Sequence, residues 1–167
     1  MLTGDSINWE QINSQVLSIP VFFGNLVFFS KMNNRHQWRH NVSLKLQETD
    51  TVIYLAFIRN AVQHLPGVVE KPSYSTPGFF AGKKLFARMK EDGETLVVQT
   101  HERGKWIETD PLTFFVTDHY LNYDYMLVAL KTVSPEVLTK LLTIAWCNRA
   151  TNKLIKEYED RGYTKPF

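Results

Sequence analysis

From residue 51 onward, apolar and polar positions follow first a helical and then an extended period. Apolar side chains recur every three or four residues between residues 51 and 65, which predicts a helix with one buried face: Leu55, Ile58, Ala61, Val62 and Leu65. Pro66 and Gly67 follow directly, and this pair is typical of a helix end. Residues 68–77 are rich in Ser, Thr and Pro, so they predict a loop.

Short strands separated by turn signals fill the middle of the chain. Residues 79–81, 84–89 and 95–100 predict three strands, with turns at Gly82-Lys83 and Asp92-Gly93. Glycine accepts the positive φ that a tight hairpin turn requires, so Asp92-Gly93 is the strongest of these signals. Further along, residues 101–109 predict a short helix, and residues 113–117 and 125–131 predict two more strands.

The last regular pattern is helical, and its start is marked by two residues. Ser134 offers an N-cap oxygen, and Pro135 suits the first helical position. Its predicted buried stripe consists of Val137, Leu138, Leu141, Leu142, Ala145 and Trp146. Residues 153–159 prolong this helix or form a second one. The order of elements predicts an α+β fold, with an antiparallel sheet of about five strands and an N-terminal and a C-terminal helix packed on one face.

Residues 1–51 differ from the rest, because they hold six of the ten asparagines and show no sustained period. We expect this segment to lie outside the folded domain, as a disordered extension or as the product of a mis-assigned gene start. The alternative is a genuine appendage that packs four aromatic side chains on the sheet or on a partner: Phe22, Phe23, Phe28 and Phe29. The domain itself is expected over residues 52–160, followed by a tail over residues 161–167.

Composition and charge narrow the class of protein without naming a function. Nineteen basic and seventeen acidic side chains give a net charge of +2, and a single cysteine, Cys147, allows no internal disulfide and fits a reducing cytoplasm. The most apolar run, residues 19–29, is shorter than the roughly 20 residues of a spanning helix, so no membrane crossing is expected. Phosphate loops and dinucleotide fingerprints are missing from the sequence, and His36 and His40, four residues apart, have no third metal ligand beside them. We therefore expect no enzyme activity, cofactor or metal.

Several stretches of the sequence, taken in order, resemble the MmcQ/YjbR family. They are Leu65-Pro66-Gly67-Val68, the segment Ser73-Tyr74-Ser75-Thr76-Pro77-Gly78-Phe79, the segment Gly82-Lys83-Lys84-Leu85-Phe86-Ala87-Arg88, the segment Phe114-Phe115-Val116-Thr117-Asp118-His119-Tyr120, and Ala145-Trp146. The resemblance spans roughly residues 52–156. It implies a CyaY-like fold that carries two protruding hairpins, the double wing, and it implies binding to double-stranded DNA.

Two functional hypotheses follow from these residues. In the first, the chain binds DNA weakly and largely without sequence preference, through basic residues on and near the wing hairpins: Lys83, Lys84, Arg88, Lys90, Arg103 and Lys105. In the second, the chain is an adaptor that binds a protein or a small ligand in a groove formed by Tyr74, Thr76, Phe79, His119 and Tyr120. Both sets have a purely structural alternative, in which the lysines are solvated turn residues and His119 holds its loop by hydrogen bonds and ring packing.

Overall fold

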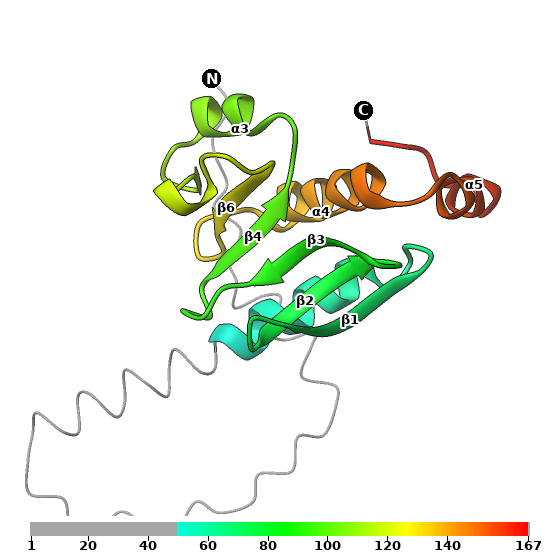
Figure 1. Ribbon diagram of the computed structural model, residues 1–167, viewed down its shortest axis with the longest axis horizontal. Helices are drawn as coiled ribbons and strands as arrows, with labels where there is room; N and C mark the ends of the chain where they lie inside the picture. Colours follow the sequence, from blue (N-terminus) through cyan, green and yellow to red (C-terminus); the bar gives the residue numbers. More distant parts are fainter. Residues whose placement is uncertain (1–49, 167) are drawn as a thin grey trace, which may run out of the picture. The chain divides into compact units, whose positions relative to one another are not determined.

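The computed structural model describes residues 50–166 of the chain. The expectations for the segment before residue 50, including its four phenylalanines, lie outside these residues. Between residues 50 and 166, the chain forms an antiparallel sheet with helices against it (Figure 1). None of the helices in this part of the chain is long and apolar enough to cross a membrane.

The sheet has six strands in the order β1-β2-β3-β4-β6-β5, and all neighbouring pairs are antiparallel. The strands β1 to β4 follow one another along the chain, so three tight connections build this half of the sheet. The turns after β2 and β3 contain Gly82 and Gly93, whose φ angles of +61° and +70° confirm the predicted glycine turns. The strands are β1 Val68–Ser73, β2 Thr76–Ala81, β3 Lys84–Met89, β4 Thr95–Gln99, β5 Phe114–Phe115 and β6 Tyr125–Ala129.

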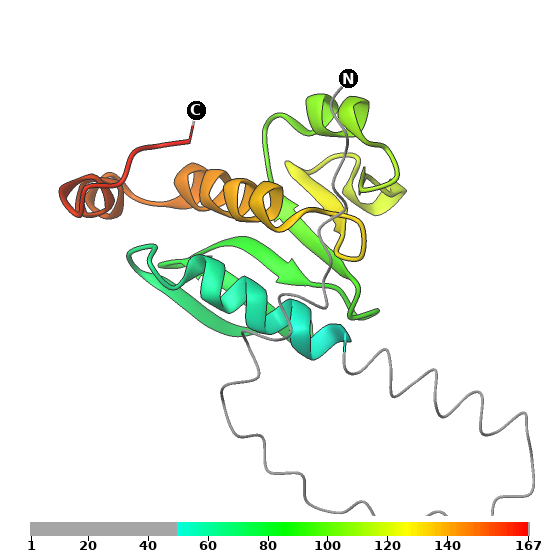
Figure 2. The ribbon, with the colours of Figure 1, turned by 180° about the vertical axis from the view of Figure 1, so that it is seen from behind.

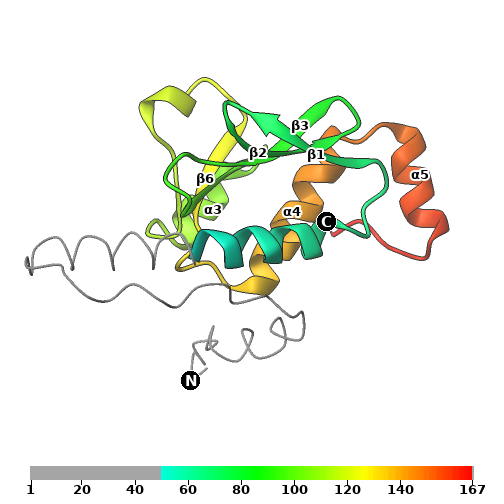
Figure 3. The ribbon, with the colours of Figure 1, turned by 90° about the horizontal axis from the view of Figure 1, so that it is seen from below.

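Two helices cover one face of this sheet, the helix over residues 50–62 and α4, Pro135–Arg149 (Figures 2 and 3). As predicted, Ser134 caps α4, because its side chain accepts a hydrogen bond from the backbone N–H of Val137. The shorter helical elements are α3 Arg103–Thr109, the 3₁₀ turn η1 Asp118–Tyr120, and α5 Asn152–Asp160. The predicted α+β class, with an antiparallel sheet and helices on one face, is confirmed.

The main hydrophobic core lies between the sheet and these two helices. Its largest buried side chain is Trp146 of α4, which is 0% exposed and donates a hydrogen bond from Nε1 to the carbonyl of Pro66 at 3.1 Å. From the sheet side, Phe79 and Phe86 pack into the same core, with ring centroids 6.5 Å apart. The bond to Pro66 ties α4 to the loop that follows the 50–62 helix, so the core also fixes the start of β1.

The loop predicted over residues 68–77 is wrong, because β1 and the start of β2 occupy it. β1 is an edge strand, and most of its residues are exposed, so it lacks the alternating apolar pattern by which strands are recognised. Its structure comes from pairing along β2, from Val68 opposite Ala81 to Ser73 opposite Thr76. At the other edge, the strand predicted over residues 113–117 is reduced to Phe114–Phe115.

Candidate functional site

A cavity of about 380 Å³ opens on the sheet face that the helices leave uncovered. Its walls are mainly aromatic, and they come from the β1–β2 turn, from the η1 segment and from β6. We call this cavity the tyrosine groove. Arg88 of β3 lies among the aromatic rings, and Leu85 and Val97 add aliphatic surface. The aromatic residues that line it are Tyr74, His119, Tyr120, Tyr123 and Tyr125.

An irregularity in the pairing of β2 with β3 decides which β3 side chains face this groove. Phe79 pairs with Ala87, but Phe80 pairs with Leu85, so Phe86 is an extra residue on β3. Phe86 and Ala87 both point into the core, whereas Leu85 and Arg88 line the groove. Without this bulge, side chains three positions apart on a strand would face opposite sides of the sheet.

The guanidinium of Arg88 is held by four oxygen atoms. Its Nη1 donates to Oε1 of Glu91 at 2.9 Å, to Oγ1 of Thr76 at 3.2 Å and to the carbonyl of Met89 at 3.3 Å. Its Nη2 donates to the hydroxyl of Tyr120 at 3.1 Å. Arg88 is only 8% exposed, and a buried charge needs such partners to offset the loss of water. Arg88 therefore joins β3 to β2, to η1 and to the turn after β3.

Electrostatics support this arrangement. Burial lowers the pKa of Arg88, but the hydrogen bonds with Glu91 and Tyr120 and the attraction of their oxygens outweigh it, so the pKa lies above its usual value. The pKa of Glu91 is lowered, first by a hydrogen bond from its own backbone N–H and then by Arg88. Arg88 and Glu91 thus face each other as a charged pair, of which only Arg88 is buried.

The η1 segment that carries His119 and Tyr120 is fastened by Arg103 of α3. Its guanidinium donates to three carbonyls at the end of η1 and just after it: those of Tyr120 at 3.1 Å, Leu121 at 2.8 Å and Tyr123 at 2.9 Å. Beneath this segment, Tyr120 packs with Val97 and Leu127 in a small second core on the open face of the sheet. The groove wall formed by residues 118–123 is therefore held mainly by polar contacts and one small apolar cluster.

Tyr74 occupies the opposite wall in an unusual backbone conformation. Tyr74 and Ser75 have φ angles of +50° and +64°, in the left-handed region that non-glycine residues rarely adopt. Both are the central residues of the β1–β2 turn, where Asn-Gly would be the favoured pair. The Tyr74 side chain is 81% exposed, and its ring lies over the Arg88 guanidinium, 5.1 Å from centroid to carbon. The turn accepts backbone strain while holding an exposed aromatic ring above a buried cation.

The structure separates the six residues that were predicted to contact DNA. Arg88 lies in the groove and Arg103 fastens the η1 segment, so both guanidinium groups are engaged within the domain. Lys90 pairs with Asp92 at 3.6 Å, and Lys105 pairs with Glu102. Lys83 and Lys84, at the β2–β3 turn, are exposed and make no ion pair with any residue in the described part of the chain.

The predicted groove residues come together with one exception. Tyr74, His119 and Tyr120 line the cavity, and Thr76 contacts Arg88 at its wall. The predicted place of Phe79 in the groove is wrong, because Phe79 is 1% exposed and lies in the main core. Side chains of β2 alternate between the two faces of the sheet, so Phe79, three positions after Thr76, faces the opposite side. Within residues 50–166, His119 makes no hydrogen bond; its ring packs edge-on against Tyr120 at 4.7 Å and lies 6.1 Å from Tyr123.

Sequence reasoning missed the remaining lining residues. Tyr123 and Tyr125 flank the start of β6, and their alternate spacing with the buried Leu127 was the available signal for a shared face. No sequence signal placed Glu91 in the groove, because an acidic residue next to a turn is normally solvated.

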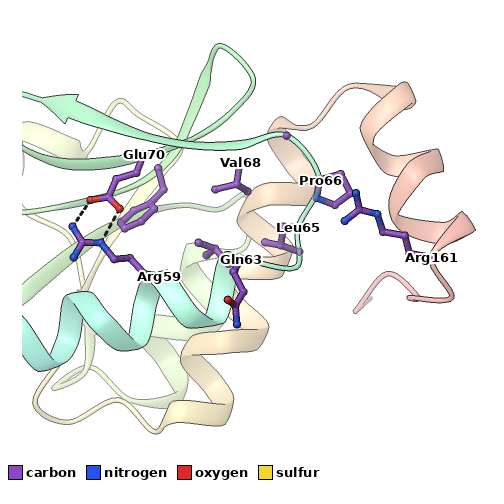
Figure 4. A pocket seen from close by; sticks show the side chains of 10 residues that line it. Arg59, Gln63, Leu65, Pro66, Val68, Glu70 and Arg161 are labelled. Atoms are coloured by element: carbon purple, nitrogen blue, oxygen red, sulfur yellow. Dashed lines mark hydrogen bonds and ion pairs between the residues drawn. The ribbon is translucent and has the colours of Figure 1, made fainter. Parts of the chain in front are cut away.

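A second cavity, of about 420 Å³, lies near the end of the 50–62 helix and β1 (Figure 4). The apolar residues that line it include Leu65, Val68 and Phe79. On one side, Arg59 binds Glu70 through two hydrogen bonds of 2.7 and 2.8 Å. On the other side, Arg161 donates to Glu157 at 2.5 Å. Both cations have an acidic partner and are themselves about half exposed, whereas Arg88 in the groove is buried.

Residues suited to metal binding or nucleophilic catalysis are dispersed. Residues 50–166 contain no group of three or more His, Cys, Asp or Glu side chains that could hold a metal ion. Cys147 is half-buried on α4, against the main core, and burial raises the pKa of its thiol. His119 lies on the other side of the sheet, so the two are not a nucleophile and base pair.

Comparison with known proteins supports the fold. No family model and no curated protein matches the sequence. Among solved structures, the crystal structure of Deinococcus radiodurans protein DR2400, which contains a DUF419 domain, is similar with a TM-score of 0.50 and 20% sequence identity. The match covers 64% of this chain and 86% of that chain. At this identity the likeness concerns the fold.

Proposed function

We propose that this chain is a ligand-binding protein and that the tyrosine groove is its binding site. The observation that carries the proposal is Arg88, a cation only 8% exposed, in a cavity walled by aromatic rings. The groove volume of about 380 Å³ falls in the range of small-molecule sites, which combine apolar walls with a few placed polar groups. The strained turn at Tyr74 and Ser75 supports the same interpretation, because strain of this kind clusters at ligand-binding sites.

The test is a screen of small ring compounds against the full chain, followed by protein NMR spectra. We expect bound compounds to shift the signals of Leu85, Val97 and the groove tyrosines. Leu85→Trp places a large ring in the groove and should abolish these shifts. Leu112→Trp makes the same replacement at a side chain that is 83% exposed and outside the groove, so it should leave them unchanged. Shifts that survive in Leu85→Trp would refute the site.

A second candidate function is DNA binding through Lys83 and Lys84. It is supported by their exposure next to each other at the β2–β3 turn, and by the resemblance of the sequence to the MmcQ/YjbR family, to which the DUF419 domain is related. With two phosphate contacts, a plot of the logarithm of the binding constant against the logarithm of the salt concentration should have a slope of about −2. Replacing both lysines by alanine should remove most of this slope, whereas Lys105→Ala should not. No binding to duplex DNA at low salt would rule this function out.

A further inference from the structure

The polar groups of the tyrosine groove specify the charge of its ligand. Arg88 is the only Lys or Arg among the lining residues, and Glu91 is the only Asp or Glu. Three of the four oxygens around the Arg88 guanidinium are neutral, and they belong to Thr76, Met89 and Tyr120. Within residues 50–166, Glu91 therefore supplies the only negative charge hydrogen-bonded to the buried cation, and its side chain is 58% exposed.

The contact between Glu91 and Arg88 leaves donor capacity unused. Glu91 binds through one oxygen to Nη1, which shares its hydrogens among three acceptors. Nη2 carries two hydrogens but has one acceptor within residues 50–166, the Tyr120 hydroxyl. A carboxylate that bridges Nη1 and Nη2 would make the two parallel hydrogen bonds of the favoured fork geometry, where Glu91 makes one.

The walls of the groove specify the shape of the ligand. The Tyr74 ring lies over the guanidinium on one side, and the His119 and Tyr120 rings stand edge-on to each other on the other side. Aromatic walls of this kind bind flat rings by offset stacking and edge-to-face contact. The volume of about 380 Å³ accommodates a molecule of one or two rings.

We infer, on the basis of the proposed function, that the groove binds a small aromatic carboxylate whose carboxylate group replaces Glu91 on Arg88. The ligand's ring lies between Tyr74 and the His119–Tyr120 pair, and Glu91 swings into solvent, where its side chain already has most of its surface. Glu91 thus acts as a built-in competitor: it neutralises Arg88 in the empty groove, and it weakens every anionic ligand by the free energy of the contact that must be broken. Neutral ring compounds bind without this competition.

The test compares 2-naphthoate with 2-naphthamide, which has a similar shape but no charge, by NMR titration of the full chain. We expect naphthoate to bind about tenfold more tightly, because charge-assisted hydrogen bonds to arginine are stronger than neutral ones. Glu91→Gln should tighten naphthoate by about threefold to tenfold and leave naphthamide unchanged. Glu108→Gln makes the same charge change at an exposed residue of α3 outside the groove, and should alter neither.

Each alternative result has a distinct meaning. Equal affinities for the two compounds, with shifts confined to the groove, would refute the carboxylate inference while the groove remained a binding site. Equal tightening by Glu91→Gln and Glu108→Gln would reduce the effect to net charge and also refute it. If neither compound shifts groove signals, the inference and the proposed function both fail. A parallel titration with inorganic phosphate should give weak binding, since phosphate lacks the ring; tighter binding by phosphate would overturn the aromatic part of the inference.

Discussion

The two faces of the sheet are stabilised in different ways. The face under the 50–62 helix and α4 is closed by large apolar side chains such as Trp146 and Phe86, both 0% exposed. The opposite face has a small apolar cluster around Leu127, and its remaining cover is fastened by two arginines, Arg88 and Arg103. One face therefore carries most of the folding free energy, whereas the other keeps an open groove whose walls depend on polar contacts. Substitutions in such a groove can therefore change its walls while the main core stays folded.

The largest effect is expected on the helix-covered face. Trp146→Ala removes the largest buried side chain and its hydrogen bond to the Pro66 carbonyl. We expect a loss of about 3–5 kcal/mol of unfolding free energy, measured by urea denaturation. Trp106→Ala, at a half-buried tryptophan of α3, is the matched control and should cost clearly less. Equal losses for the two variants would contradict the central role of α4.

On the groove face, the loss of Arg103 should loosen the wall formed by residues 118–123. Arg103→Ala removes three hydrogen bonds to the carbonyls of Tyr120, Leu121 and Tyr123, so we expect a loss of about 1–3 kcal/mol. Hydrogen exchange should accelerate at residues 118–124 and stay unchanged in α4. His119→Ala, in the same segment, removes a ring without a hydrogen bond to the described chain, and should change stability by less than about 0.5 kcal/mol. Unchanged exchange in Arg103→Ala would show that other contacts hold this wall.

Relief of strain at the groove rim should stabilise the protein. Ser75→Gly places glycine at a φ of +64°, and we expect a gain of about 0.5–1 kcal/mol, because the left-handed penalty exceeds the entropy that glycine loses on folding. Thermal unfolding measures the gain. Ser73→Gly, two residues earlier in β1, lacks a positive φ and should instead be destabilising. A destabilised Ser75→Gly would mean that the serine side chain contributes to the turn.

The smallest effect is expected on stability at acid pH, where one ion pair from each face of the sheet can be compared. Arg59 lowers the pKa of Glu70, and a backbone hydrogen bond together with Arg88 lowers the pKa of Glu91. A carboxyl whose pKa is lower in the folded state stabilises the fold above its unfolded value near 4.5, and this stabilisation disappears as the pH falls through the folded value. Glu70→Gln and Glu91→Gln should each reduce the acid-induced loss of stability by less than about 1 kcal/mol. Acid unfolding followed by circular dichroism tests this, and a variant that becomes more acid-sensitive would contradict the sign.

Local patterns were sufficient for the elements that have their own signals. The apolar stripe and the Ser134 cap predict α4, and the Asp92-Gly93 turn predicts the β3–β4 hairpin. β1 was missed because an exposed edge strand has no apolar period, and its conformation depends on hydrogen bonds with β2. A strand of this kind cannot be identified without its partner.

The sequence by itself determined part of the groove. It predicts that Tyr74, His119 and Tyr120 lie together, and the structure places all three around one cavity. Only the tertiary structure decided the roles of Phe79 and Arg88. The alternation of β2 turns Phe79 into the core, and the extra residue Phe86 turns Arg88 out of it. A bulge is a property of two paired strands, so the spacing within one strand cannot reveal it. The same reason makes Arg88 a buried groove cation, whereas the sequence presents it as one more basic residue beside Lys84 and Lys90.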